Sequence, residues 1–441
     1  MLTTDRQREM ICDNVEYDSA GRLRFANMSV QSLAEKYGTP LYLYDEARIR
    51  ERCREYISAA EDAFLGRTRL LYASKAASFK RIYEIMKEEN MGIDVVSSGE
   101  IYTAHLAGYP LSCAYFHSNN KTDSDIEYAI DLGVGYFVVD NVEELYAIDR
   151  IAGERGVSQK VLLRITPGID PHTFAAVSTG RVDSKFGSAI ETGQAEEITR
   201  VALSLPNIDL RGFHCHVGSQ IFDTEVYLRA ADVMLCFIAD IRVRTGFLAA
   251  ELDMGGGFGV RYIPEQSNVD IAAMISDIGS FMLRRADELG IPMPIVAFEP
   301  GRSIVADAGL TVYTVGTVKR ISGYKTYVSV DGGMTDNPRY ALYGAPYTIL
   351  PVELSATTDT ECVSVVGRCC ESGDVLVDNV SIPPKIQRGD LLACLTTGAY
   401  NYSMASNYNR LPRPPIVMLN NGESYVAVKR ESFEHLALLD I

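Results

Sequence analysis

Hydrophobic and polar positions follow a repeating pattern from about residue 40 to residue 305. Short apolar runs rich in β-branched and aromatic residues are each followed by a longer stretch of helical periodicity, which is typical of βα units around a parallel sheet. The eight runs are Leu70–Ser74, Gly92–Val96, Cys113–Phe116, Tyr136–Val139, Val161–Ile165, Gly212–Cys215, Leu252–Met254 and Ile295–Phe298. Eight parallel strands close a barrel. The pattern therefore predicts a (β/α)8 barrel domain over residues 40–305.

The stretch from Ser124 to Leu132 illustrates the helices expected between the strands. Its apolar positions, Ile126, Ala129, Ile130 and Leu132, fall on one helical face. Asp123 or Ser124 is the expected N-cap, since short polar side chains accept hydrogen bonds from the first free N–H groups of a helix.

The texture changes after residue 305. Alternating segments such as Leu310–Val318, Tyr327–Val330 and Cys362–Val366 are separated by turn signals, and helical stretches are few. Residues 306–441 are therefore predicted to form a second, β-rich domain.

Composition narrows the classes of function. The 441 residues include 58 acidic and 42 basic side chains, a formal net charge of -16, which disfavours nucleic acid and membrane partners. The first ten residues contain no apolar segment of the kind found in signal peptides, so a cytoplasmic protein is expected. The nine cysteines are scattered without a CxxC pair, which favours reduced thiols over a disulfide framework or a zinc site.

Residues suited to chemistry stand just past the predicted strands. They are Lys75, Ser97, His117, Asp140, Thr166, His216, the Gly255–Gly257 triplet and Glu299. Active sites of (β/α)8 barrels lie at the carboxyl ends of the strands. The placement therefore predicts an enzyme whose site is built from these strand ends.

Two histidines close to the end of the sixth run admit two interpretations. His214 and His216 point to the same side of a strand, because side chains alternate with period two. Such a pair could bind a metal in a barrel hydrolase, but that needs further ligands from other strands. Alternatively, His214 is a buried histidine whose hydrogen bonds are satisfied, and His216, beside a Gly-Ser turn, meets a ligand.

The loops after the last two runs favour an anion. The glycines of Gly255–Gly257 let backbone N–H groups approach a ligand closely, and Glu299-Pro300-Gly301-Arg302 adds an acid and an arginine. Phosphate sites of barrels are frequently formed by the loops after strands seven and eight.

Taken together, these motifs resemble those of the fold-type III pyridoxal phosphate (PLP) decarboxylases over nearly the whole chain. The motifs are Tyr72–Ala76, His216–Gln220, Gly255–Gly257, Glu299–Arg302, Cys370–Ser372 and Gly398–Tyr400. The family implies an alanine-racemase-like barrel and a β-rich barrel domain formed by residues 1–39 plus 306–441. Further motifs are most similar to those of the members that decarboxylate meso-2,6-diaminopimelate to L-lysine, the last step of lysine biosynthesis. They are Ser178–Gly180, Ser184–Gly187 and Asp336–Arg339.

The resemblance implies a role for each site residue. Lys75 would bond covalently to PLP, His216 stack on its ring, and Glu299 pair with its ring nitrogen. The other cofactor-binding residues would be Asp94, Ser219, Gly256, Gly257, Gly301, Arg302 and Tyr400. Arg302, Arg339, Tyr343, Glu371 and Tyr400 would bind the substrate, and Cys370 would donate a proton after decarboxylation. No metal is implied.

The resemblance also implies a homodimer, with Cys370 and Glu371 supplied by the partner subunit. One departure is Tyr340, where the family often has proline, and it leaves the shape of that loop open. Three alternatives are kept: a sibling decarboxylase acting on another diamino acid or polyamine precursor, an inactive homologue that regulates a true decarboxylase, and the metal-dependent hydrolase.

Overall fold

The computed structural model describes residues 11–169, 185–355, 359–383 and 385–441. The chain divides into two compact units. The β-rich unit comprises Met1–Glu51, Val260–Asn268 and Ile304–Ile441, and the barrel unit comprises Arg52–Gly259 and Val269–Ser303. The first boundary thus falls after Glu51 instead of at residue 40, and a short segment following the seventh barrel strand joins the β-rich unit.

The barrel unit contains a closed ring of eight parallel strands, as predicted. The strands are β5 (Thr68–Ala73), β6 (Gly92–Val95), β7 (Ala114–Phe116), β8 (Tyr136–Val139), β9 (Gln159–Thr166), β11 (Ile208–His214), β12 (Glu251–Asp253) and β13 (Ile295–Phe298). They are ordered as in the sequence, and the ring closes because β13 pairs with β5. A short strand, β10 (Ser188–Ala189), adds to the edge of β9.

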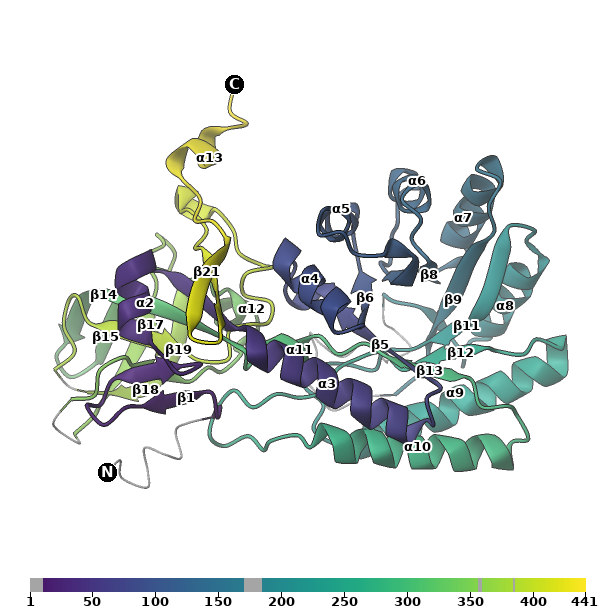
Figure 1. Ribbon diagram of the computed structural model, residues 1–441, viewed down its shortest axis with the longest axis horizontal. Helices are drawn as coiled ribbons and strands as arrows, with labels where there is room; N and C mark the ends of the chain where they lie inside the picture. The colour runs from purple at the N-terminus through teal and green to yellow at the C-terminus, as the bar shows by residue number, and fades with distance from the viewer. Residues whose placement is uncertain (1–10, 170–184, 356–358, 384) are drawn as a thin grey trace. The chain divides into compact units, whose positions relative to one another are not determined.

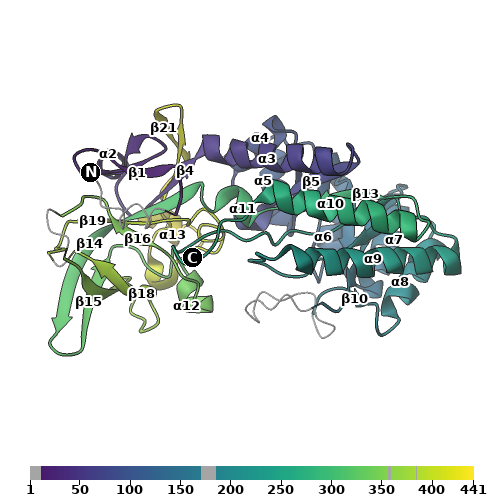
Figure 2. The same ribbon diagram turned by 90° about the horizontal axis from the view of Figure 1, so that it is seen from below.

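Helices connect the strands on the outside of the ring (Figures 1 and 2). They are α4 (Lys80–Glu88), α5 (Ser98–Leu106), α6 (Asp123–Asp131), α7 (Val142–Glu154), α8 (Gln194–Ser204), α9 (Thr224–Thr245) and α10 (Ile271–Glu288), and α3 (Glu46–Ala63) leads into β5. Helices α9 and α10 lie side by side in both views.

The predicted cap of α6 is wrong by one or two residues. Thr122, not Asp123 or Ser124, is the N-cap, and its side chain accepts from the N–H of Asp125. The Asp125 carboxylate accepts from the Thr122 N–H in return, which completes a capping box. Asp123 and Ser124 instead lie in the first turn of the helix.

Aromatic side chains fill the barrel near the amino ends of its strands. The rings of Tyr115 and Tyr136 stack with centroids 4.3 Å apart. Arg69 donates to both hydroxyls at 2.9 Å, and Tyr115 donates to Glu251 at 2.5 Å. This network satisfies the polar ends of large buried residues, so the amino end of the barrel is structural.

The β-rich unit is confirmed as a separate fold. Its elements are β1 (Val15–Tyr17), β2 (Leu23–Phe25), β3 (Met28–Ser29), α2 (Val30–Tyr37), β4 (Leu41–Asp45), β14 (Gly309–Ile321), β15 (Lys325–Val330), α12 (Arg339–Tyr343), β16 (Ile349–Pro351), β17 (Glu361–Val366), β18 (Val375–Ile382), β19 (Leu391–Cys394), β20 (Ile416–Asn420), β21 (Glu423–Val428) and α13 (Phe433–Ala437). The main sheet has the order β18-β17-β15-β14-β4-β20-β21, with β19 also pairing β14 and β16.

Strand β4 explains why the amino-terminal segment belongs to this unit. It pairs antiparallel with β14 and parallel with β20, and all five of its residues are buried. Leu41 and Leu43 pack in one core with Leu310, Val312 and side chains of β20. A continuous apolar run is what a central strand buried on both faces requires.

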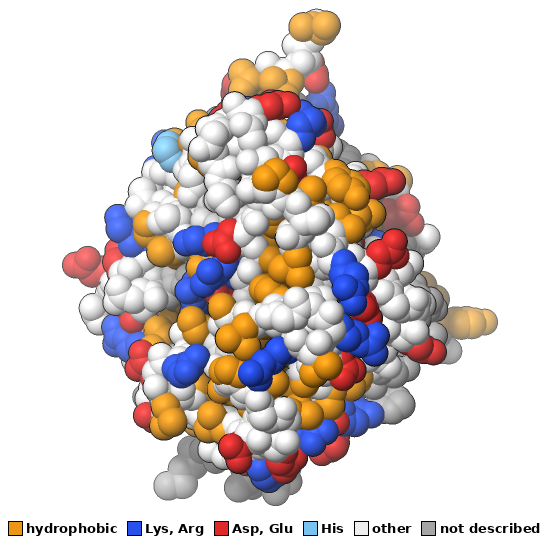
Figure 3. All heavy atoms as spheres, turned by 90° about the vertical axis from the view of Figure 1, so that its right-hand side faces the viewer, with side chains coloured by type: hydrophobic (Ala, Val, Ile, Leu, Met, Phe, Trp, Pro, Cys, Tyr) orange, Lys and Arg blue, Asp and Glu red, His pale blue; other side chains and the backbone are white. Residues whose placement is uncertain are grey.

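The surface is mixed in charge. On the face in Figure 3, Lys and Arg side chains lie close to Asp and Glu and to scattered hydrophobic residues. Among the described residues, no helix combines the length and apolar character needed to cross a bilayer. The nine cysteines are free thiols.

Candidate active site

The carboxyl ends of the barrel strands bring polar side chains together inside the barrel unit. Lys75 lies just past β5, in a short 3-10 helix (Ser74–Ala76), and Asp94 lies within β6. His117 directly follows β7, His214 ends β11, and Glu299 directly follows β13. Since parallel strands of a barrel all end on one side, these residues form one site, and the distances below confirm their proximity.

Glu299 lies between two imidazole rings. Its Oε1 is 2.7 Å from His117 Nε2, and its Oε2 is 3.2 Å from His214 Nε2. The three side chains are 4%, 5% and 1% exposed, respectively. Burial alone would raise the pKa of Glu299, but the two imidazoles bring this pKa well below its usual range. The carboxylate therefore stays ionised.

Lys75 lies beside a second buried acid. Its Nζ donates to Asp94 Oδ2 at 3.4 Å, and Asp94 is fully buried. Burial lowers the pKa of His216 well below its usual range, and the charge of Lys75 lowers it further. His216 is therefore a neutral imidazole near the lysine.

The buried Glu100 should make the free energy of unfolding depend on pH. Burial raises its pKa to about 7, although the Val96 N–H donates to it at 2.7 Å, and the charge of Asp94 raises the pKa further. Between pH 4.5 and 7 the native state holds a proton that the unfolded state has released, so stability falls as pH rises through this window.

We expect Glu100→Gln to remove this fall. In urea titrations at pH 5 and pH 7.5, the difference in unfolding free energy between variant and wild type should change by up to about 3 kcal/mol in favour of the variant at the higher pH. Parallel stability curves for the two proteins would contradict the assignment.

The glycine loop has unfilled hydrogen-bond donors. Within the described part of the chain, the buried N–H groups of Gly256 and Gly301 donate to no protein acceptor. Nearby, Arg302 Nη2 donates to Ser219 Oγ at 2.9 Å. Buried backbone donors are almost always paired in native proteins. Free donors beside an arginine thus fit a phosphate group.

Two buried acceptors fit the other end of a PLP molecule. Within the described chain, Glu299 Oε1 and Asp94 Oδ1 have no hydrogen-bond donor in line. A protonated ring nitrogen would supply one. The donors for the phosphate and the acceptors for the ring come from the same set of strand ends as Lys75, so the residues present fit this cofactor.

Gly256 has no room for a side chain. A Cβ at this position would lie 2.0 Å from the carbonyl oxygen of Glu299, although its φ lies outside the left-handed region. We expect Gly256→Ala to push the two loops apart, lowering the unfolding free energy by about 1–3 kcal/mol and weakening PLP binding. Denaturation and PLP titration by visible absorbance measure the two effects. Gly99→Ala is the control, because its Cβ would meet only Ser97 Oγ, at 3.7 Å.

Three predicted residues meet within the β-rich unit. The Arg339 guanidinium lies 5.6 Å from the Tyr343 ring centroid and 5.1 Å from that of Tyr400. Arg339 is buried, and its Nε has no hydrogen-bond partner among the described residues. The segment around Tyr340, whose shape the sequence does not decide, is a short regular helix, α12, that starts after Pro338. Tyr340 follows Arg339 within this helix.

Cys370 and Glu371 lie in the turn between β17 and β18 and are exposed. The Cys370 N–H donates to Asn409 Oδ1 at 2.7 Å, and the Gly373 N–H donates to Glu371 Oε1 at 3.2 Å. The turn is therefore held by hydrogen bonds within itself and to Asn409, while both side chains remain exposed.

His214 is buried, as predicted, and its Nε2 is within hydrogen-bond distance of Glu299 Oε2. The sequence assigns no role to His117, because its contact with Glu299 depends on closure of the barrel. The ligand atoms of His117, His214 and Glu299 lie within 4.8 Å of one another, close enough to bind one metal ion. This group does not include His216, so it differs from the His214–His216 pair considered from the sequence. Ser178–Gly180 and Ser184 lie outside the described residues.

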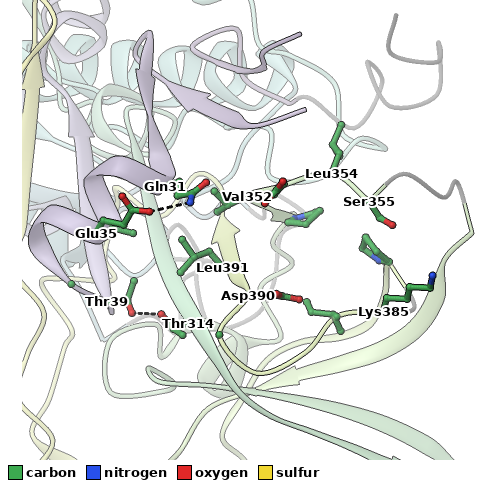
Figure 4. Close-up of a pocket in the computed structure, with 17 residues that line it drawn as sticks. Gln31, Glu35, Thr39, Thr314, Val352, Leu354, Ser355, Lys385, Asp390 and Leu391 are labelled. Atoms are coloured by element: carbon green, nitrogen blue, oxygen red, sulfur yellow. Dashed lines mark hydrogen bonds between the residues drawn. The ribbon is translucent and has the colours of Figure 1, made fainter. Parts of the chain in front are cut away.

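A pocket of about 570 Å³ lies elsewhere, in the β-rich unit (Figure 4). Gln31 Nε2 donates to Glu35 Oε1 at 3.0 Å, and the hydroxyls of Thr39 and Thr314 are 2.5 Å apart. These lining groups satisfy one another, and none of the residues predicted to do chemistry lines the pocket.

Comparison with known proteins defines the class. Residues 46–306 match a family model described as the pyridoxal binding domain of pyridoxal-dependent decarboxylases. This match covers more than half of the chain and includes every barrel strand. The chain belongs to the pyridoxal-dependent decarboxylase family.

The individual relatives narrow this class. The diaminopimelate decarboxylase of Bacillus subtilis (strain 168) is 43% identical over 421 residues, 96% of this chain and 95% of the relative. That of Staphylococcus aureus (strain COL) is 40% identical, covering 97% and 99%. A diaminopimelate decarboxylase structure from M. jannaschii in complex with L-lysine has a TM-score of 0.90, 33% identity, and coverage of 97% and 98%. Within the family, these relatives place the chain among the diaminopimelate decarboxylases.

Proposed function

We propose that the protein uses PLP to decarboxylate meso-2,6-diaminopimelate to L-lysine and CO2, the last step of lysine biosynthesis. The observation that carries this proposal is the meeting, at one end of the barrel, of three features. They are Lys75, the ionised Glu299, and the N–H groups of Gly256 and Gly301, which have no acceptor among the described residues. The relatives named as diaminopimelate decarboxylases favour this substrate over the other diamino acids of sibling enzymes.

The barrel unit would hold the cofactor. Lys75 would bind it covalently, with Asp94 beside the lysine and His216 against the ring. Ser219, Gly256, Gly257, Gly301 and Arg302, with Tyr400, would hold the phosphate. When bound, PLP supplies an electron sink for the carbanion left as CO2 departs, and the negative charge of Glu299 keeps the ring nitrogen protonated for that purpose.

The β-rich unit would complete the site. Arg339 and Tyr343, with Arg302 and Tyr400, would bind the distal carboxylate of the substrate, since a guanidinium matches a carboxylate in two parallel hydrogen bonds. Glu371 would pair with the distal ammonium. Cys370 Sγ would return a proton to the α-carbon.

We further propose a homodimer in which Cys370 and Glu371 serve the partner subunit. The exposure of Cys370 and Glu371 supports this arrangement, because side chains on the surface of one subunit can reach the active site of a partner. The nine free thiols are suited to a reducing compartment, and we place the protein in the cytoplasm.

Purified protein tests the proposal directly. We expect a yellow protein with visible absorbance that releases CO2 from meso-diaminopimelate and much less from ornithine, arginine or lysine. Preferred turnover of one of those three amino acids would favour the sibling enzyme. Cofactor binding without any turnover would favour the inactive homologue, and a stoichiometric metal without PLP would favour the hydrolase.

A further inference from the structure

The two imidazoles around Glu299 come from different strands and converge on different oxygens. The backbone N–H of His117 donates to the Val95 carbonyl at 2.8 Å, which fixes the main chain at this strand end. Its ring packs edge to face on that of His214, with centroids 4.9 Å apart and planes at 72°. His214 Nε2 is within hydrogen-bond distance of Oε2, whereas His117 Nε2 lies 2.7 Å from Oε1 without the alignment of a hydrogen bond among the described residues. The His214 hydrogen bond and the close His117 contact together restrict the rotation of the Glu299 carboxyl group.

Other buried acids lie close to Glu299 and oppose its ionisation. Asp94 Oδ1 is 3.9 Å from His117 Nε2, and the fully buried Asp253 lies close enough for the charge of Glu299 to raise its pKa. Arg164, on β9, supplies a positive charge that acts on Glu299. Lys75 is a further cation, beside Asp94. Three buried carboxyl groups close together would favour protonation of one of them unless donors are aimed at a particular acid.

His214 is a donor in its neutral form. Burial lowers its pKa to about 4, so at neutral pH the ring carries one proton. Its Nε2 is within hydrogen-bond distance of Glu299 Oε2, whereas its Nδ1 is buried with no partner among the described residues. The tautomer with the proton on Nε2 is therefore the one that stabilises an ionised Glu299.

We propose that His117 and His214 are positioning residues that hold Glu299 ionised and oriented toward the ring nitrogen of the cofactor. This inference rests on the proposed function and adds a role that the sequence motifs leave unassigned. His117 and His214 act through Glu299, so removing their Nε2 groups should alter the protonation of the bound ring and the rate of turnover more than the binding of substrate.

Paired substitutions separate donation from packing. Glutamine places its side-chain N–H2 near the position of histidine Nε2, whereas asparagine places it near Nδ1, out of reach of Glu299. Glutamine and asparagine are therefore compared at each histidine, since both are polar but differ in reach. The variants are His117→Gln and His117→Asn, and His214→Gln and His214→Asn. His105→Gln is the outside control, because His105 is exposed on α5.

The main readout is the ring-nitrogen signal of holoenzyme loaded with 15N-labelled PLP. We expect wild type and both glutamine variants to give the signal of a protonated ring, and both asparagine variants to shift toward the unprotonated signal. The asparagine variants should lose about 10- to 100-fold in kcat, the scale seen when groups that orient a reacting group are removed, with little change in KM. Glutamine variants should recover most of this loss.

Asparagine variants that retain the protonated signal would overturn the inference, as would equal losses for asparagine and glutamine. A stoichiometric metal bound with PLP would also overturn it. If an asparagine variant releases PLP, the carbon-13 signal of the Glu299 carboxyl in the apoprotein decides: its pKa must rise relative to wild type, and an unchanged pKa refutes the inference. Wild-type protein that binds no PLP would refute the proposed function instead.

Discussion

Lys75→Ala should abolish turnover, with a loss on the order of 10⁴-fold or more, the scale expected when the reacting group itself is removed. Lys75 lies at the carboxyl end of β5, next to Asp94, and its side chain is 42% exposed, so a carbonyl compound can reach its Nζ. In wild type, borohydride should reduce the carbon–nitrogen double bond between lysine and cofactor and leave a stable adduct on one peptide.

Peptide mass spectrometry should locate that adduct at Lys75. The matched control is Lys80→Ala, because Lys80 is exposed at the start of α4, five residues along the chain. It should keep both turnover and the adduct. Substantial activity in Lys75→Ala, or an adduct on another lysine, would contradict the assigned role.

The second large effect is expected for Cys370→Ala. If Cys370 Sγ donates the proton to the product carbanion, kcat should fall by about 10²- to 10⁴-fold, the usual contribution of a general acid, with KM nearly unchanged. Cys369→Ala is the control. The Cys369 thiol is half-buried. Burial raises its pKa, and the nearby charge of Asp374 raises the pKa further, so this thiol is a poor proton donor.

Mixing two inactive variants tests whether the site is shared between subunits. Random reassociation of Lys75→Ala with Cys370→Ala makes half of the dimers mixed, and each mixed dimer has one intact site if Cys370 serves the partner. About a quarter of wild-type activity should then return. If each subunit uses its own Cys370, every site keeps one defect and no activity returns.

The barrel could be predicted because strands buried on both faces have short, continuous apolar sequences. Each of the eight predicted runs overlaps an observed strand, from Leu70–Ser74 on β5 to Ile295–Phe298 on β13. Strand β4 has the same appearance, Leu-Tyr-Leu-Tyr, but pairs with β14 and β20. Apolar character identifies a buried strand, whereas its sheet depends on partners that are far away in the sequence.

The site shows the same limit. Positions such as Lys75, Glu299 and the glycine triplet could be proposed because each follows a strand. The contacts of Glu299 with His117 and His214 join residues 182 and 85 positions apart and exist only once β7, β11 and β13 share one barrel. Likewise, Thr122 caps α6 because of backbone geometry that periodicity could not resolve.

The strand pairing has a consequence for synthesis on the ribosome. The barrel closes only when β13 reaches β5, so Glu299 is among the last of its site residues to be translated. Strand β4 is made early but must wait for β20, near the end of the chain, before both of its edges are paired. Domains fold as units during synthesis. The barrel should therefore form first, while an apolar amino-terminal strand remains exposed and dependent on protection until translation is nearly complete.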